Sequence, residues 1–497
     1  MHVIQLLILC RSVDLKTSGY GSVLRPLIQD LKVLEQEGIE VEVNKVKYSF
    51  RGTVSFVSAD NLAAHSLGGF NESFSSLRIS RFCMVTKRQK NHCMNAETCD
   101  MRTIQTYNAH VSMVTQDPEM KSVYGVKMDS PLNQLSYFHV IQGLPSDIAH
   151  DIFEGIVPEV LGKLTIYCVE KGFFSNEYLN DQISNFTYGE VDKANKPSRM
   201  ATVTSNFVIK QTALQCWHLL RLFPLLVGDK VPEDDAKWNV LSNLMFMVEA
   251  VCAPIVSKAD AVILSNLIED FLCSYKEQFP SVSLRPKYHY ALHYPSQMLQ
   301  YGPLLHCWTM RFEGKHNYFK EIIYGIKNRK NVSKTLAVRH QVMQSIHYAS
   351  ENFLETEKLD SVNGKHVHVR LLLNEIQDLL QPLLGNKEKV YQCASMKVNG
   401  VKFCSASCVV LQCNDSTMPA FGVIEECYII GGIPYLLCAQ TENLGFSYHY
   451  HSYILRKLER FRLLKPTDTY AYHPLDMYLY PFDKNLKMVT LRHKISV

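Results

Sequence analysis

The stretch "GTVSFVSADNLAAHSLGGF" (Gly52–Phe70) decides how the N-terminal part of the chain is interpreted. Its first nine residues alternate β-branched and small side chains and end on Asp60, which predicts a strand. Active sites in open α/β sheets are built at the carboxyl ends of strands, so Asp60 is a candidate site residue. Asp-Asn before a helix is also a common N-cap, and the pattern alone favours this plainer role.

The residues on either side of this stretch extend the prediction. The short apolar run at residues 2–10 is typical of a buried strand; it lacks the cationic leader of a signal peptide. Residues 21–37 place leucines and valines at helical spacing. The first 70 residues therefore predict strand, helix and strand, which is a βαβ unit with a parallel pair.

The remainder of the chain can be divided by residue composition and by the spacing of its apolar residues. Residues 81–135 are polar and irregular, and residues 144–350 are mainly helical with several prolines between the segments. Residues 351–386 indicate further helix and a linker. From Lys389 onward, short β-rich runs broken by glycine and proline predict a small antiparallel β domain, with a barrel as one option.

Composition limits the class of protein. The 497 residues are 46% hydrophobic and 20% charged, which predicts a folded protein of two to four domains. The net charge of +4 is mild, so a nucleic-acid partner would need local basic clusters. The 15 cysteines follow no disulfide framework, which favours a reducing compartment, nucleus or cytosol, and no secretion. No apolar run is long enough to predict a membrane span.

A single carboxylate stands out in "MRFEGKHNYFK" (Met310–Lys320). On a helix, Glu313 lies within a basic band that runs from Arg311 to Arg339. An acid that holds a divalent ion beside bases that hold a strand is what a phosphodiester-cutting site needs. A solvated basic helix with i,i+4 ion pairs is the simpler alternative, and the pattern alone favours it.

Two further segments carry metal-ligating residue types. In "GLPSDIAHDIFEGI", residues Asp147, His150, Asp151 and Glu154 share one helical face. They could bind a metal, although a solvated face is the favoured interpretation.

The second segment, "PKYHYALHYP", has two histidines four residues apart, His289 and His293. This spacing is compatible with zinc, but the glutamate of a metalloprotease motif is missing. The flanking prolines leave room for only about two helical turns. Core or surface histidines are therefore favoured.

Taken together, several stretches resemble one family. The stretches are "VSADNLAAHSLGGF", "SRFCMVTK", "YFHVIQGLPSDIAHDIFEGIVPEVL", "PKYHYALHYPSQMLQYGPLLHCWTMRFEGKHNYFK" and the β-rich tail. They resemble, in order and over most of the chain, transposon-derived proteins of the CMC group (CACTA, Mirage, Chapaev) of DDE transposases.

The resemblance implies an RNase H-like core in which three carboxylates hold two divalent ions, Mg or Mn, for DNA strand cleavage and transfer. Asp60 matches the second carboxylate and Glu313 the third, with a large helical insertion between them. Asp147 and His150 match the family's Asp/Cys-x-x-His motif. The expected DNA contacts are Arg311, Lys315, Lys320, Lys327, Arg329 and Lys330.

The sequence departs from the family in two places. The paired cysteines, with two residues between them, appear here as Ser80 and Cys83, which puts a metal knuckle there in doubt. The first Asp is absent, because "MHVIQLLILC" resembles the third strand of the core and the first two strands would lie upstream of Met1. We therefore expect catalysis to be impaired.

The expected organisation is an incomplete RNase H-like core, an insertion and a β-rich end. The predicted parts are 1–80 (start of the core), 81–285 (mainly helical insertion), 286–350 (return to the core with the Glu helix), 351–388 (helical linker) and 389–497 (β-rich domain). The partner of the β-rich domain and the formation of a homo-oligomer stay open.

Three functions compete at this point. The leading hypothesis is an impaired DDE-type transposase homologue that retains DNA affinity, expected in the nucleus. The second is a non-catalytic nuclear remnant that binds DNA or protein. The third is an unrelated metal-dependent hydrolase that uses Asp147 and His150. Only the spacing of these residues supports it.

Overall fold

The computed structural model describes residues 4–73, 76–204, 207–327, 330–349, 359–414, 417–470 and 473–495. The chain folds into two compact units that are each assembled from separate stretches of sequence. The first comprises Met1–Ile152, Ala261–Leu272 and Ser281–Leu354. The second comprises Phe153–Asp260, Cys273–Pro280 and Glu355–Val497.

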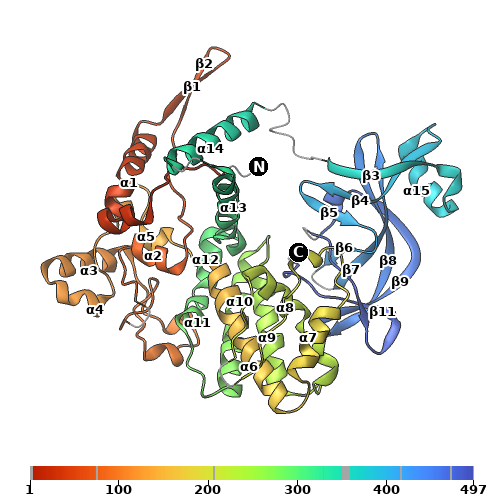
Figure 1. Cartoon of the computed structure of the whole chain (residues 1–497), viewed down its shortest axis with the longest axis horizontal. Helices are drawn as coiled ribbons and strands as arrows, with labels where there is room; N and C mark the ends of the chain where they lie inside the picture. The colour runs from red at the N-terminus through yellow and green to blue at the C-terminus, as the bar shows by residue number, and fades with distance from the viewer. Residues whose placement is uncertain are drawn as a thin grey trace. The chain divides into compact units, whose positions relative to one another are not determined.

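The first unit is mainly helical (Figure 1). Its helices are α1 (Ser12–Gln36), α2 (Asn61–Leu67), α3 (Ile104–Gln116), α4 (Lys121–Tyr124), α5 (Val140–Gly143), α11 (Pro286–Ala291), α12 (Tyr294–Tyr301), α13 (Met310–Gly325) and α14 (Val332–Tyr348), and α10 (Lys258–Gln278) is shared between the units. The helix predicted over 21–37 is the second part of α1, which follows a non-helical Gly19.

The strands of the first unit form a hairpin, and the predicted parallel βαβ pair is wrong. Strands β1 (Ile39–Val43) and β2 (Val46–Phe50) pair antiparallel. Asn44 and Lys45 between them both have positive φ, at 53° and 66°. This is the backbone of a two-residue hairpin turn whose twist matches that of the strands.

The two segments predicted as parallel strands have no strand pairing among the described residues. Residues 1–3 lie outside the described part, and residues 4–11 and 51–60 are irregular. Val54 and Val57 pack against the core around Phe70 and Tyr107 without a β-ladder. Leu7 and Leu9 are 67% and 40% exposed, so the burial predicted for residues 2–10 is wrong as well. An apolar run requires neither burial nor a strand.

The second unit combines helices with a large sheet. Its helices are α6 (Val157–Glu170), α7 (Asn176–Asn185), α8 (Ala213–Val227), α9 (Ala236–Val251) and α15 (Asn374–Leu384). Helix α8 starts with a capping box of Thr212 and Gln215 and is buried along most of its length. Such a helix, apolar on nearly every side, belongs in the middle of a core.

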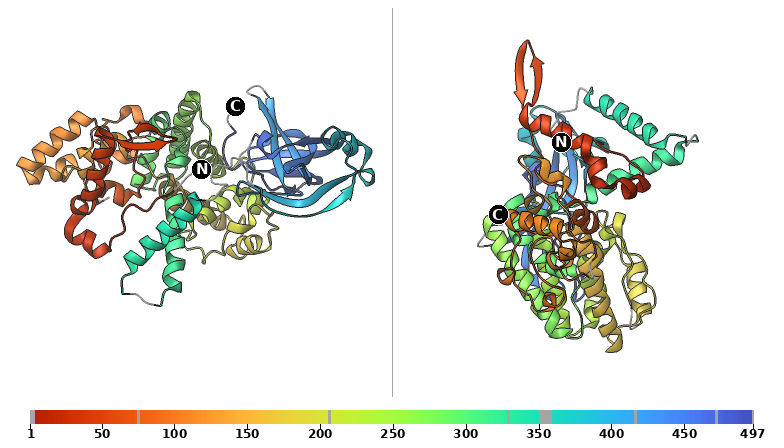
Figure 2. Two further views of the ribbon diagram at one scale, coloured as in Figure 1. Left: turned by 90° about the horizontal axis from the view of Figure 1, so that it is seen from above. Right: turned by 90° about the vertical axis from the view of Figure 1, so that its left-hand side faces the viewer.

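The sheet is antiparallel and curls on itself (Figure 2). Its strands are β3 (Leu359–His368), β4 (Lys389–Val398), β5 (Val401–Cys404), β6 (Cys408–Asn414), β7 (Thr417–Ile430), β8 (Ile433–Ser447), β9 (Ser452–Leu464), β10 (Tyr478–Tyr480) and β11 (Asp483–Val489). They follow the order β10-β11-β9-β8-β7-β4-β3, with β5 beside β4 and β6 beside β7. Register shifts within the β7–β8 and β8–β9 pairs let these long strands bend.

The prediction of an antiparallel β domain from Lys389 is confirmed, since β4 begins at that residue. The helical linker predicted over 351–388 is partly wrong, because β3 occupies Leu359–His368 and α15 is the one α-helix among the described residues of this stretch. Residues 351–358 of that linker lie outside the described part. Within the described residues, no helix is both long and apolar enough to cross a membrane.

Candidate metal centres

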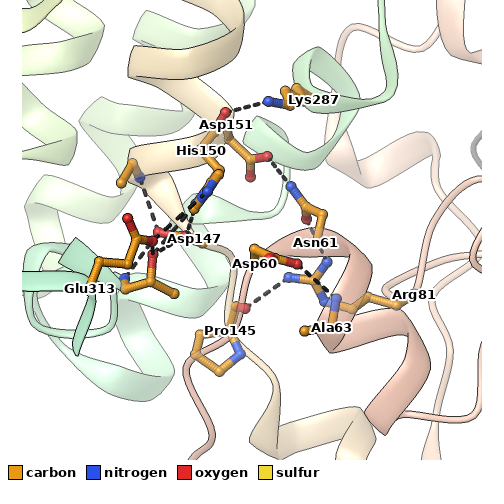
Figure 3. A network of polar contacts seen from close by, with 12 residues as sticks. Asp60, Asn61, Ala63, Arg81, Pro145, Asp147, His150, Asp151, Lys287 and Glu313 are labelled. Carbon is orange, nitrogen blue, oxygen red and sulfur yellow. Dashed lines mark hydrogen bonds and ion pairs between the residues drawn. The ribbon is translucent and has the colours of Figure 1, made fainter. Parts of the chain in front are cut away.

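Three residues predicted from two distant motifs meet in the first unit. Asp147 and His150 come from the loop and the start of a π-helical segment (Ala149–Ile156), and Glu313 comes from the first turn of α13. One ligand atom from each lies within 4.8 Å of the other two. Figure 3 shows their side chains directed toward one another. We call these three residues the acidic site.

Thr309 links the members of the acidic site. Its Oγ1 lies 2.6 Å from Asp147 Oδ2 and 2.7 Å from Glu313 Oε1. Its backbone N–H donates to Asp147 Oδ1 at 3.2 Å, where Ala149 N–H also donates. One hydroxyl proton cannot serve both carboxylates, so the two acids compete for it.

The three side chains of the acidic site differ in their exposure to solvent. The Asp147 side chain is 1% exposed, His150 26% and Glu313 45%. Burial opposes ionisation of Asp147, but hydrogen bonds with His150 and Thr309 lower its pKa below the ordinary value. His150 Nδ1 lies 2.5 Å from Asp147 Oδ2, while its Nε2 lies 3.9 Å from Glu313 Oε1. The atoms that face solvent are thus an imidazole nitrogen and a carboxylate.

The structure does not bring Asp60 into this group. Asp60 is the N-cap of α2, where its Oδ1 accepts the backbone N–H of Ala63 at 2.8 Å. Among the contacts of the described residues, none joins Asp60 to Glu313. The N-cap role that the pattern favoured is therefore the one that the structure shows, and a metal-binding role of Asp60 stays a prediction.

A buried network that the sequence did not reveal fixes the start of α2. Asn61 donates to Asp151 Oδ1 at 2.6 Å and accepts from Arg81 Nη1 at 2.9 Å. Arg81 also donates to the Pro145 carbonyl (Figure 3). Tyr294 donates to Asp151 Oδ2 at 3.2 Å. Burial raises the pKa of Asp151 to about 6. The network ties α2 to the segment that carries Asp147 and His150.

The predicted DNA-binding residues lie on α13 and in the loop after it. Arg311, Lys320, Lys327 and Lys330 are exposed, and Lys315 lies 4.3 Å from the centroid of the Tyr318 ring. Arg329 lies outside the described residues. The basic lining of the pocket between α13 and α14 includes Lys327, Lys330 and Arg339.

A second group of ligand-type residues was only partly visible in the sequence. Cys83, Cys99, His289 and His293 place one ligand atom each within 4.8 Å of the others. The spacing of the two histidines is visible in the sequence, where it favours a core or surface role. The partner thiols lie about 200 residues away in the chain, so no local motif could connect them. We call these four residues the thiol–histidine cluster.

Compared with models of known protein families and with curated protein sequences, the chain matches none. What the sites can do must therefore follow from their chemistry. The acidic site offers hard oxygen ligands and one imidazole, which suit Mg²⁺ or Mn²⁺. The thiol–histidine cluster offers softer ligands, which suit Zn²⁺.

Proposed function

We propose that the chain is a DDE-type DNA transposase homologue of the CMC group, with an acidic site that binds a divalent cation beside DNA. The observation that carries this proposal is that Asp147 and His150 meet Glu313, although about 160 residues separate them. The resemblance assigns these residues to two separate motifs of one family, and their convergence is what a shared active site requires.

The three residues would have different roles in cation binding. Glu313 Oε and His150 Nε2 face the open side and would be the ligands, while Asp147 orients the imidazole through Nδ1. A bound Mg²⁺ or Mn²⁺ would supply charge for a phosphodiester oxygen. The RNase H-like core that the resemblance implies belongs to this proposal as well.

The proposal includes impaired catalysis. Two-metal cleavage needs carboxylates that hold both ions. Among the described residues, Asp60 caps α2, and no hydrogen bond or ion pair joins its side chain to Glu313. We therefore propose that the chain binds one cation and cleaves DNA poorly or not at all.

A non-catalytic role is the second candidate, and the N-cap role of Asp60 favours it. In this case the chain is a nuclear remnant that binds DNA through the basic residues of α13 and the following loop. Asp60→Ala and Glu313→Ala would then leave DNA binding unchanged.

The test is a Mn²⁺ titration of the purified full-length chain, with free Mn²⁺ followed by electron paramagnetic resonance. We expect one bound ion per chain and an affinity that falls at least about tenfold in Glu313→Gln. Glu321→Gln is the matched control, since it removes an exposed carboxylate from the same helix. Equal Mn²⁺ binding by the two variants, or none by the wild type, would refute the proposed site.

A further inference from the structure

The thiol–histidine cluster is closed and mostly buried. Cys83 is 0% exposed, His289 2% and His293 1%, and Cys99 is half-buried. Cys83 Sγ lies 3.0 Å from His289 Nε2, which lies 3.3 Å from His293 Nε2. Four ligand atoms therefore point at one small volume in the interior of the first unit.

Protons alone satisfy this arrangement poorly. Two imidazole nitrogens 3.3 Å apart can share only one proton, and a thiol is a weak donor. A thiolate beside imidazoles is the form in which these residues bind metals.

The distances fit one tetrahedral ion. Zinc bonds of about 2.0–2.3 Å place neighbouring ligand atoms roughly 3.3–3.8 Å apart in a tetrahedron. The measured separations are close to this range, and all four atoms stay within 4.8 Å. Two sulfurs and two nitrogens without an open position make a structural zinc site.

The backbone explains why Cys99 belongs to the cluster. Met84 N–H donates to the Asp100 carbonyl and Arg102 N–H donates to the Phe82 carbonyl, so the chain on either side of Cys83 pairs with the chain around Met101. This pairing places Cys99 beside Cys83.

Ser80 occupies the position of the first cysteine in the family's pair, and its side chain has another task. Its Oγ accepts the backbone N–H groups of Phe82 at 3.1 Å and Cys83 at 3.3 Å. Ser80 therefore shapes the turn that presents Cys83. Its hydroxyl oxygen already accepts two backbone N–H groups, and a hydroxyl is a poorer zinc ligand than a thiolate.

We propose that the first unit holds a structural Zn²⁺ on Cys83, Cys99, His289 and His293, with Cys99 as the ligand that the residue at position 80 does not supply. Cys93 is the competing thiol, because its Sγ lies 3.2 Å from Cys99 Sγ. A pocket lined by His92, Cys93 and Cys99 reaches the cluster's half-buried side and gives the ion a path of entry.

The ion would join segments that are far apart in the sequence. Cys83 and Cys99 lie in the loops after α2, whereas His289 is on α11 and His293 directly precedes α12. Helix α12 leads to Thr309 and α13, so the site would steady the region that carries Glu313. This proposal does not depend on DNA chemistry, and its test uses no DNA.

The experiment uses the full-length chain produced with added zinc and dialysed against metal-free buffer. Elemental analysis should find one zinc per chain, and zinc X-ray absorption should find two sulfur and two nitrogen neighbours. The Cys99→Ser variant should lose the zinc or one of the two sulfurs, whereas Cys93→Ser should keep the full set. The wild-type ligand count stands even where a variant fails to fold.

Three results would overturn the assignment. The first is wild-type protein without bound zinc, including protein in which Cys93 and Cys99 form a disulfide. The second is zinc with only nitrogen and oxygen neighbours. The third is loss of zinc in Cys93→Ser together with full retention in Cys99→Ser, which would make Cys93 the ligand. None of these results bears on Mn²⁺ binding by Glu313.

Discussion

Asp147 is the residue that gives the acidic site its geometry. Its Oδ1 accepts two backbone N–H groups, and its Oδ2 is within hydrogen-bond distance of His150 Nδ1 and Thr309 Oγ1. A carboxylate with both oxygens engaged in this way orients its neighbours more readily than it binds an ion.

From this role we predict the effect of Asp147→Asn. The amide keeps one acceptor but loses the charge that holds the imidazole, so His150 Nε2 is no longer aimed at Glu313. Mn²⁺ affinity should fall about 10- to 100-fold, as it does when an orienting partner of a metal ligand is removed. Isothermal titration of the variant beside Glu321→Gln measures this. An unchanged affinity would show that Asp147 has no part in the site.

Asp151 makes the opposite electrostatic contribution. Burial raises its pKa from 3.8 to about 6, although Asn61, Arg81 and Lys287 act against the shift. The folded state therefore binds more protons than the unfolded state between about pH 4 and 6. The contribution of Asp151 to the free energy of unfolding is therefore most favourable at low pH. It falls by at most about 3 kcal/mol as pH rises through about 6.

The Asp151→Asn variant should abolish this pH dependence. Asparagine can still accept from Asn61, and its amide can donate to the Tyr294 hydroxyl, so the network survives. Relative to the wild type, the free energy of unfolding from urea titrations should rise from pH 4 to pH 7. In the Asp147→Asn control the change should have the opposite sign and lie mainly below about pH 4, because the lowered pKa of Asp147 adds stability that is lost as pH falls through that pKa. Parallel pH profiles for Asp151→Asn and the wild type would disprove the assignment.

At the scale of single residues, the sequence identifies a candidate site residue where its type is rare among its neighbours. It does not identify a residue whose role depends on contacts with residues far away in the chain. Glu313 could be singled out because it is an acid in a basic band, and the Asp147–His150 pair because of its spacing. Arg81 and Asn61 gave no signal, since their function depends on burial beside Asp151. Cys99 likewise becomes a candidate ligand only when the pairing around Cys83 is known.

At the scale of elements, α13 presents Glu313 but carries a glycine directly after it. A Cβ added at Gly314 meets no atom within 4 Å, so the close backbone packing that a helical glycine suggests does not explain it. Gly69 is different, because its φ is +70° and a Cβ there would collide with the Met128 carbonyl.

These two glycines give a matched prediction. Gly314→Ala should stabilise the fold by about 0.5–1 kcal/mol, since alanine is the better helix former and the space is open. Gly69→Ala should destabilise it by more than about 1 kcal/mol through strain and collision. Thermal unfolding followed by circular dichroism compares both with the wild type. A lower Tm for Gly314→Ala would mean that α13 depends on flexibility at this position.

The elements also show which parts of the fold the sequence could predict. The β-rich end was found because its short alternating runs are separated by glycine and proline, and β4 starts where the texture changes. The β1–β2 hairpin was missed because its turn is Asn-Lys and lacks the usual glycine. The run before Asp60 was mistaken for a strand because buried irregular backbone and buried strand share the same apolar pattern.

At the scale of the whole molecule, charge is unevenly distributed. The chain carries a net charge of only +4, yet residues 322–349 contain no aspartate or glutamate. Lys327, Lys330 and Arg339 of this stretch line one pocket at the C-terminal end of α13, the helix that carries Glu313 in its first turn. At 1.5 Å per helical residue, this pocket lies about 18 Å from Glu313 along α13. A nucleic-acid backbone bound there would have to run along the helix to reach the acidic site.

If DNA binds to this surface, a few lysines should account for a measurable part of the salt dependence of its affinity. Each phosphate contact contributes about 0.9 to the slope of log K against log salt concentration. Replacing Lys320, Lys327 and Lys330 with alanine should lower the slope by up to about 3, and should weaken binding to unrelated duplexes alike, because such contacts carry no sequence information. Fluorescence anisotropy with labelled duplexes at several salt concentrations measures both quantities.

The matched control removes the same charge elsewhere. Lys258, Arg460 and Lys484 are exposed residues of the second unit, and their triple alanine variant has the same net charge as the first. If binding reflects a local phosphate track on α13 and its following loop, the control slope should stay within about 0.5 of the wild type. Equal losses in the two variants would mean that net charge alone drives binding. In that case the basic surface of α13 and its following loop would have no special role, and DNA would not be delivered to the acidic site by it.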